Sequence, residues 1–339
     1  MPAARNRRAT MMDVANLAGV SYQTVSRVVN HHPNVAPATR ERVLRVIEDM
    51  RYRPSQAARA LAARRTGTLA VVTYNMMHFG PTQMIANLDV QARDAGYDLM
   101  VVHVNPTNPA ALNGVVDQLL RWEPEGVLLV APIQSALYQD LVRHLEEIPM
   151  VQLDIQPGSS ARSVIVDQRE GSRRMTSLML EFGHRLIVEI AGPPDWYGAA
   201  ARHIGMADVL DAHGLEPVFL QYGDWSAESG YRAAVRALER GRFTAIVAAN
   251  DQMALGAIRA LQVAGLRVPE DVSVGGFDDV PEAAYFTPPL TTIRQDFTEL
   301  ARQGLAYLIR AIADPVAEHG QRVIMPRLIQ RESAGPRLR

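Results

Sequence analysis

The sequence predicts two parts: an all-α helix-turn-helix head and an α/β bilobed core with two parallel-sheet lobes. The first 66 residues hold 12 arginines against 4 acidic residues, whereas the remainder holds 23 arginines and 32 acidic residues. Short apolar helices flank a glycine turn near the N-terminus, and strand-like and helix-like segments alternate after residue 67. We expect a head at 1–50, a hinge helix at 51–66 and a core at 67–339, with an N-lobe near 67–166 and 297–325 and a C-lobe near 167–296 and 326–339.

The composition excludes several classes of protein. The chain has no cysteine, which rules out disulfides and thiolate metal sites, and its nine histidines lack metal-ligand spacing. No apolar run approaches the ~18 residues of a membrane span, and the basic N-terminus lacks the apolar stretch of a secretory signal. We therefore expect a cytoplasmic, nucleoid-associated protein that has no cofactor, no metal and no membrane partner.

The uneven charge favours binding to a polyanion. A basic first fifth attached to an acidic body is typical of a nucleic-acid-binding head. The alternative is an unevenly charged but merely solvated surface. All 35 basic residues are arginine, and we attribute that uniformity to genome composition rather than to function.

Three short helices are predicted in the head. Apolar residues at 3–4 spacing indicate a helix at Met11–Ala18, which Gly19 ends. Ser21 is a good N-cap for a second helix, Tyr22–Asn30, and a third runs from Pro37 to about Met50. This is the helix-turn-helix pattern. The expected inward residues are Val25, Val28 and Val29 of the second helix and Val43, Leu44 and Ile47 of the third.

The second helix carries side chains suited to reading DNA bases. Gln23 can pair with adenine through two hydrogen bonds, and Arg27 can do the same with guanine. Tyr22 offers a hydroxyl and a flat apolar surface, and Ser26 lies on the same face. The alternative is an ordinary three-helix bundle with polar faces. The candidate phosphate contacts are Ser21, Thr24, Asn30 and Thr39.

The segment after the third helix is rich in alanine and arginine. Pro54 stops the preceding helix, and Ser55 can cap a new one that extends to Ala63. Such a segment has little to anchor it and suits folding on DNA. Leu61 is its only large apolar residue and is a candidate wedge between minor-groove base pairs. From the residues alone, a plain linker helix is the favoured interpretation.

The core shows two successive sets of strands and helices. Near-continuous apolar strands that alternate with helices indicate parallel sheets covered on both faces. The predicted helices are 81–95, 109–121, 135–146, 198–213, 227–240 and 253–264. The predicted strands are 69–74, 98–104, 126–132, 149–154 and 163–167 in the first half and 186–192, 217–222, 244–250 and 272–278 in the second.

Polar residues follow several of these strands, where ligands of parallel sheets bind. Carboxylates and an amide that converge on a cleft suit sugar hydroxyls, and aromatic rings such as Trp225 and Phe297 can pack on a pyranose. Each residue also has a structural alternative: Asp251 as a helix cap, Asp278 in a turn, Trp225 in the core. The strand-end residues are Tyr74, Asp154, Asn250, Asp251 and Asp278.

Four motifs resemble the LacI/GalR family of bacterial repressors along nearly the whole chain. They are SYQTVSRVVN (Ser21–Asn30), GDWSAESG (Gly223–Gly230), ANDQMALGAIRAL (Ala249–Leu261) and PPLTTIRQDF (Pro288–Phe297). The resemblance implies a periplasmic-binding-protein-like core and a repressor that a small molecule controls allosterically.

The resemblance also implies roles for single residues. Tyr22, Gln23 and Arg27 are implied to read bases of a palindromic lac-type operator, and Leu61 to be the minor-groove wedge, which reverses the linker-helix interpretation. The implied sugar-bonding set looks like one for a galactopyranoside, on which Trp225 and Phe297 pack. Its members are Asp154, Arg202, Asn250, Asp278 and Gln295.

Departures from the family pattern lie at Tyr74, His78 and Met84, which are implied to face the anomeric substituent. The aglycone preference is therefore open. The segment after Arg327 has no leucine heptads of the tetramer-forming kind, so we expect a homodimer. Alternatives are a family regulator for another sugar or a co-repressor, a bilobed sugar-transport receptor, and a glycosidase that uses Asp154 and Asp278.

Overall fold

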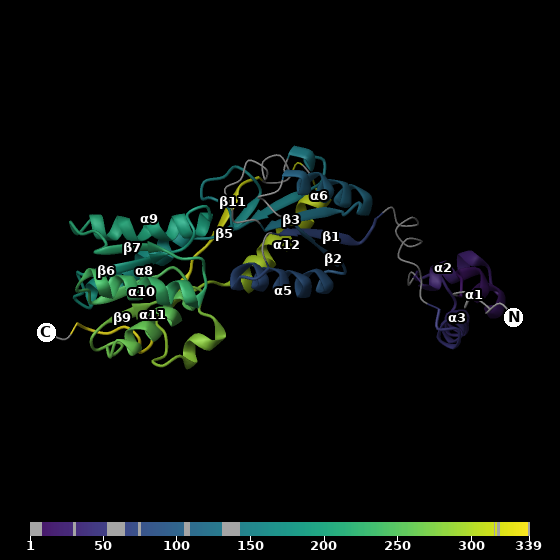
Figure 1. The fold of residues 1–339 in the computed structure, drawn as a ribbon. Coiled ribbons are helices and arrows are strands. Elements are labelled where there is room, and N and C mark those ends of the chain that lie inside the picture. The colour runs from purple at the N-terminus through teal and green to yellow at the C-terminus, as the bar shows by residue number, and fades with distance from the viewer. Residues whose placement is uncertain are drawn as a thin grey trace. The chain divides into compact units, whose positions relative to one another are not determined.

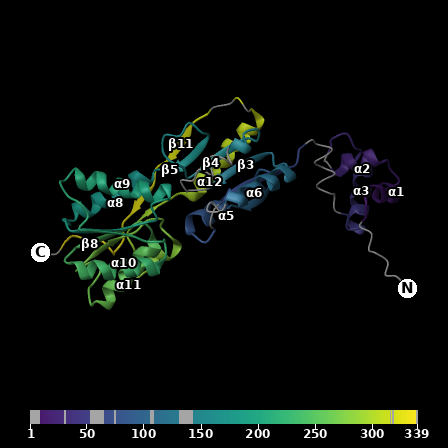
Figure 2. The same ribbon diagram turned by 45° about the horizontal axis from the view of Figure 1, so that its top comes forward.

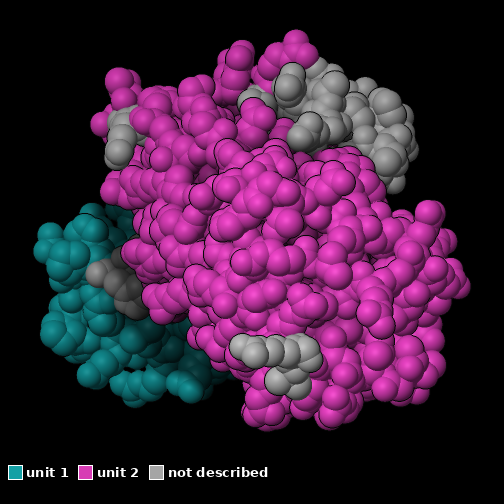
Figure 3. All heavy atoms as spheres, turned by 90° about the vertical axis from the view of Figure 1, so that its left-hand side faces the viewer, with its two compact units in different colours: residues 1–67 teal, residues 68–339 magenta. Residues whose placement is uncertain are grey.

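The computed structural model describes residues 9–29, 32–52, 65–73, 76–104, 109–130, 143–314, 316 and 319–337, the side chains of 109–113 excepted. The chain divides into two compact units, residues 1–67 and 68–339 (Figure 3). A search of the described helices finds none with the length and apolar character to cross a membrane. The predictions for Asn30, Leu61 and Tyr74, for most of the hinge segment and for most of the helix at 135–146 lie outside the described residues.

The described part of the head consists of the three predicted helices. A capping box starts the first: the Thr10 hydroxyl accepts from the Asp13 amide, and the Asp13 carboxylate accepts from the Thr10 amide. Gly19 ends that helix with a φ of 62°, a conformation that favours glycine. Ser21 caps the second, because its Oγ accepts from the Thr24 amide at 3.2 Å. The helices are α1 (Met11–Ala18), α2 (Tyr22–Val29) and α3 (Pro37–Asp49).

A small apolar core joins the three helices. Val14, Val25, Val28 and Val43 are almost fully buried in it. The predicted inward position of Leu44 is wrong, because this side chain is 45% exposed. On a helix of 3.6 residues per turn, the face set by Val43 continues at positions three and four residues later, Val46 and Ile47, rather than at the adjacent residue.

Within the described ranges, the first sheet of the core has six strands in the order β11-β5-β4-β3-β1-β2, and all its neighbouring strands are parallel. Helices cover both faces, as predicted for apolar parallel strands (Figure 1). The strands are β1 (Thr68–Thr73), β2 (Asp98–His103), β3 (Gly126–Val130), β4 (Met150–Leu153), β5 (Ser163–Val166) and β11 (Gln321–Ile324). The helices are α5 (Phe79–Asp94) and α12 (Phe297–Ala313) on one face and α6 (Pro109–Trp122) on the other.

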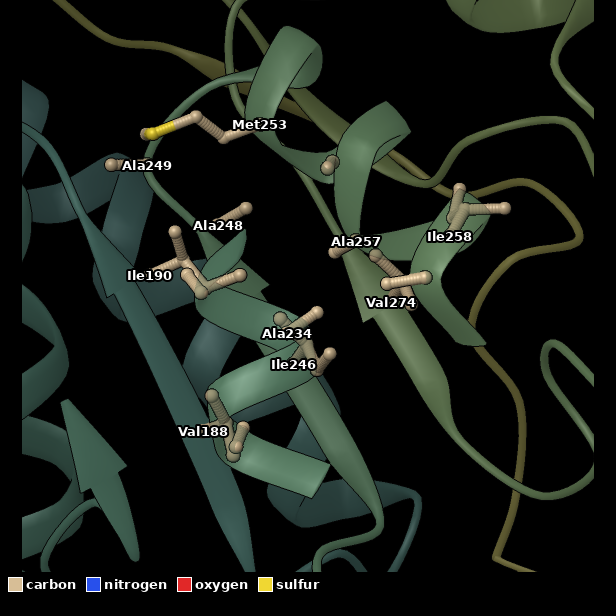
Figure 4. Packing of buried hydrophobic residues seen from close by; sticks show 14 of the residues in the cluster. Val188, Ile190, Ala234, Ile246, Ala248, Ala249, Met253, Ala257, Ile258 and Val274 are labelled. Carbon is tan, nitrogen blue, oxygen red and sulfur yellow. The ribbon is translucent and has the colours of Figure 1, made fainter. Parts of the chain in front are cut away.

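The second sheet has four parallel strands in the order β7-β6-β8-β9. Alternate residues of its central strands pack in opposite directions: Val188 and Ile190 face α10 and α11 (Figure 4), whereas Ile187 faces α8 and α9. The strands are β6 (Ile187–Ala191), β7 (Phe219–Tyr222), β8 (Ala245–Ala248) and β9 (Ser273–Gly275). The helices are α8 (Gln168–Glu181), α9 (Tyr197–Asp211), α10 (Ala227–Arg240) and α11 (Asp251–Val263).

The chain passes between the two sheets more than once, so both lobes belong to one unit (Figure 2). A short antiparallel pair, β10 (Thr292–Arg294) and β12 (Arg327–Ile329), joins two of these passages. The strand-and-helix alternation is confirmed. Helices α8 and α12, strands β10 to β12 and a 3-10 helix at Pro281–Tyr285 were not predicted.

Candidate functional site

The head presents the predicted base-reading side chains to solvent. Tyr22, Gln23 and Arg27 are exposed on α2, whereas Thr24 and Ser26 are partly buried. The buried valines of α2 lie on the opposite face and fix the helix against α1 and α3. The Ser21 Oγ lies 2.9 Å from the Thr24 Oγ1, so both hydroxyls take part in the helix cap. The contacts of these residues with DNA stay predictions.

The core has a cavity of about 310 Å³ lined by residues from both lobes. It opens at the carboxyl ends of the strands, where Asp154 follows β4 and Asn250 follows β8. Tyr74 lies outside the described residues. The cavity brings together nine predicted effector residues, namely His78, Met84, Asp154, Arg202, Trp225, Asn250, Asp278, Gln295 and Phe297.

A network of buried polar side chains forms one wall of the cavity. The Arg202 Nε donates to the Gln168 Oε1 at 2.9 Å, and its Nη2 lies 3.5 Å from the Asp278 carboxylate. Gln168 in turn donates to the Gln295 Oε1 at 2.7 Å, and Gln295 donates to the Asp278 Oδ1 at 2.6 Å. Gln168 Nε2 also lies 3.5 Å from the Asp154 Oδ1. Polar groups from both lobes thus hold one another in fixed positions.

The guanidinium of Arg202 also lies over two aromatic rings. It lies 3.8 Å from the ring centre of Phe277 and 5.5 Å from that of Trp225. Its Nη1 donates to the Ala249 carbonyl. A planar guanidinium fixed in this way offers directed hydrogen bonds to neighbouring hydroxyls.

Burial shifts the protonation of the cavity carboxylates. Removal from water raises the pKa of Asp154 and raises that of Asp278 to about 6, and the positive charge of Arg202 opposes both rises. The pKa of Arg202 is lowered by burial, against the attraction of Asp278 and Asp154. Burial lowers the pKa of His78, and the negative charge of Asp224 opposes this change.

Three residues that line the cavity have an unusual backbone conformation. Asp154, Trp225 and Asp278 have φ values of 56°, 73° and 112°, in the region that side chains other than glycine rarely adopt. Each follows the carboxyl end of a strand or lies in the loop after it. Strained backbone at converging strand ends is a feature of ligand sites.

The alternative role predicted for Asp251 as a helix cap is wrong. The cap of α11 is Asn250, whose Oδ1 accepts from the Met253 amide at 2.9 Å. Asp251 is fully buried, and its two oxygens accept from the Thr292 hydroxyl and the Val280 amide. It therefore anchors the loop that carries Asp278, and it does not line the cavity.

Several residues of the site were missed from the sequence, among them Gln168, Trp196, Asp224 and Gln252. Gln168 begins α8, a helix that was not predicted. Trp196 lines the cavity immediately before α9, and its ring contacts those of His78 and Trp225. Trp196 comes shortly after the apolar strand predicted at 186–192, and this position could have pointed to it. Trp225 belongs to the apolar core and to the cavity at once, so both of its predicted roles apply.

Comparison with known proteins identifies the family. Residues 10–55 match the model described as bacterial regulatory proteins, lacI family, and residues 176–334 match the periplasmic binding protein-like domain. The lactose operon repressor of Escherichia coli (strain K12) is 33% identical over 325 residues, which cover 96% of this chain and 90% of that protein. This chain belongs to the lacI family of bacterial regulatory proteins. The regulator CelR of Thermobifida fusca is 34% identical over 345 residues, which cover 97% of this chain and 99% of that protein.

Solved structures of this family share the whole fold. The lac repressor dimer bound to operator and the anti-inducer ONPF matches with a TM-score of 0.91 at 32% identity, over 97% of this chain and 100% of that one. A CelR–cellobiose complex matches with a TM-score of 0.73 at 31% identity, over 96% and 100%. The predicted helix-turn-helix head and periplasmic-binding-protein-like core are confirmed, and the relatives are transcriptional regulators rather than enzymes.

Proposed function

We propose that this protein is a transcriptional repressor that binds a palindromic lac-type operator as a homodimer and releases it when a galactoside-like sugar enters the cleft. The observation that carries the proposal is the polar network of Arg202, Asp278 and Gln295 in the cavity, on the same chain as a helix-turn-helix head. Carboxylate, amide and guanidinium groups at fixed positions suit a ring of hydroxyls.

The cavity has the chemistry of a sugar site. Its polar wall offers acceptors at Asp154 and Asp278 and donors at Arg202, and the aromatic faces of Trp225 and Phe297 suit the apolar face of a pyranose. The relative with the operator-bound structure is named a lactose operon repressor, which favours a galactoside.

The DNA contacts follow from the exposed face of α2. Gln23 and Arg27 read base edges in the major groove, and the second head of a dimer reads the other half-site about one helical turn away. Leu61 acts as the wedge that kinks the centre of the operator. The operator-bound relative is a dimer, which supports the same assembly here.

Release of DNA requires a coupling of two binding events. The sugar must bind the DNA-free conformation better than the DNA-bound one, and about 1–3 kcal/mol of coupling is typical. The cavity is suited to this because its walls come from both lobes: a ligand that draws the lobes together changes the N-lobe, which is connected to the hinge segment.

A second candidate is a regulator for another sugar, which the CelR–cellobiose complex favours, or for a co-repressor. A thermal-shift screen of methyl galactoside, lactose, cellobiose and purine bases separates the two, because a ligand that binds only the folded state raises the melting temperature. Stabilisation by galactosides supports our proposal, and stabilisation by cellobiose or purines alone replaces it.

We expect Gln23→Ala to weaken binding to a lac-type half-site by about 1–3 kcal/mol, with the loss confined to one base position. The side chain is exposed on α2, so the head should stay folded. Fluorescence anisotropy with a set of singly substituted operators measures the effect. An equal loss on every sequence would make Gln23 a phosphate contact instead.

Sugar affinity should fall as the pH drops below about 6, the pKa of Asp278 in the free protein. Hydroxyl donors stabilise the ionised carboxylate, so binding lowers its pKa and is strongest above pH 6. The free energy of unfolding responds in the opposite direction. The pKa of Asp278 in the folded protein lies above the ordinary 3.8, so the folded state binds the proton more tightly than the unfolded state does. Asp278 therefore makes the protein more stable as the pH falls through 6.

Calorimetric titration between pH 7.5 and 5 tests this prediction. An affinity loss of up to about tenfold per pH unit is expected below pH 6, since one proton competes with the ligand. Asp278→Asn should bind more weakly and should lose most of the pH dependence. A wild-type affinity that is constant across this range contradicts the ionised role of Asp278.

A further inference from the structure

Three aromatic side chains form a second wall of the cavity, which we call the aromatic wall: His78, Trp196 and Trp225. The Trp196 ring lies 5.2 Å from the His78 ring and 5.6 Å from the Trp225 ring, centre to centre, with interplanar angles of 82° and 70°. His78 precedes α5 on the six-stranded sheet, and Trp196 precedes α9 on the four-stranded sheet. Edge-to-face contacts of this kind are stable and directed, so the wall is preformed across both lobes.

The position of Trp196 is explained by the cavity rather than by the helix it precedes. It is the N-cap residue of α9 but makes no side-chain cap bond. A serine or an aspartate at this position would stabilise the start of the helix better than an indole does. Trp196 is only 9% exposed because its ring packs between His78 and Trp225 and lines the cavity.

Polar side chains surround the aromatic wall. Asp224, Ser226 and Gln252 line the same cavity. The Gln252 Oε1 accepts from the Asn250 Nδ2 at 2.9 Å, and the negative charge of Asp224 is close enough to act on the pKa of His78. Aromatic faces next to a carboxylate and an amide offer both kinds of contact that a hydroxylated ring needs.

We propose that Trp196 determines specificity: it packs on the second ring of a two-ring glycoside, whose hydroxyls Asp224 and Gln252 bind. This inference rests on the proposed sugar-binding function of the cavity. The network of Arg202, Asp278 and Gln295 takes the first ring, on which Trp225 packs, and this leaves Trp196 for the second ring. A volume of about 310 Å³ falls within the usual ~300–1,000 Å³ of ligand pockets.

Calorimetry on the full-length protein with three probes tests the proposal: methyl β-galactoside with one ring, lactose with two sugar rings, and phenyl β-galactoside with an aryl second ring. Trp196→Ala should weaken lactose and phenyl galactoside by about tenfold or more, as expected for the loss of an aromatic stacking partner. Methyl galactoside should change less than about threefold. The double variant D224N/Q252A should weaken lactose only, because the phenyl ring has no hydroxyls.

Two further variants separate this role from a purely structural one. Trp196→Phe keeps an aromatic face and should restore most of the lactose affinity. Trp122→Ala removes an indole that is 61% exposed on α6, outside the cavity, and should alter no affinity. Operator binding by each variant verifies that it is folded.

Three results overturn the proposal: an equal loss for methyl galactoside and lactose, a gain in lactose affinity on removal of the indole, or the failure of every two-ring glycoside to bind the wild-type protein. A wild-type protein that binds cellobiose but no galactoside refutes only the galactoside assignment. In that case the proposal stands only if Trp196→Ala weakens the binding of cellobiose more than that of methyl glucoside.

Discussion

Arg202→Ala is expected to abolish galactoside-driven release of operator DNA while operator affinity stays within about threefold of wild type. Arg202 is buried at the centre of the polar network, and the described members of that network all lie in residues 68–339. Hydrogen bonds that involve a charged group contribute about 1.5–3 kcal/mol each, so the loss of two weakens sugar binding by 100-fold or more.

The experiment needs controls because a buried cation is being removed. The loss of one member of a buried ion pair destabilises folded proteins by about 3–5 kcal/mol, so unimpaired operator binding serves as the test of folding. Arg202→Lys keeps the charge but lacks the planar fork, and it should be only partly inducible. Arg232→Ala breaks an exposed pair with Glu228 and should behave as wild type. An Arg202→Ala protein that still releases DNA on galactoside addition refutes the site assignment.

The largest loss of stability is expected for Gly256→Ala, at the crossing of α10 and α11. A Cβ at position 256 meets the Ala227 carbonyl oxygen at 1.9 Å and the Tyr231 amide nitrogen at 2.6 Å. Both are backbone atoms that cannot rotate away, so the two helices have to separate. We expect a loss of about 3 kcal/mol or more in the free energy of unfolding.

Gly114→Ala is the matched control. Gly114 lies on the exposed side of α6, and a Cβ there meets nothing within 4 Å. Alanine is the better helix former, so we expect a gain of about 0.5–1 kcal/mol. Urea unfolding followed by tryptophan fluorescence measures the core alone, because all three tryptophans, at positions 122, 196 and 225, lie in residues 68–339. Effects of the same sign for both variants would contradict the close helix crossing.

The sequence predicted most of the fold because its physical signals are local. Near-continuous apolar runs predicted nine of the ten described parallel strands in the two sheets, with ends shifted by at most three residues, and missed only β11. The rule that ligands bind at the carboxyl ends of parallel strands pointed to Asp154, Asn250 and Asp278, and these residues do line one cavity.

The remaining parts depend on contacts between distant residues. Arg202 lies within α9, away from any strand end, and its hydrogen bond with Gln168 joins residues 34 positions apart. Gln168 comes two residues after β5 ends, but it begins a helix that was not predicted. Arg202 was found only through the family resemblance, and Gln168 was not found. Trp196 follows a strand but needed the ring contacts with His78 and Trp225 to be recognised.

The central claim is that one small molecule in the cleft controls DNA binding by the head. The most direct measurement is the fluorescence anisotropy of a labelled palindromic lac-type operator bound by the full-length protein, titrated with galactoside at constant salt. We expect the sugar to weaken operator affinity by about 5–150-fold, which corresponds to 1–3 kcal/mol of coupling. A galactoside that binds the protein in calorimetry yet leaves the operator affinity unchanged would contradict this account.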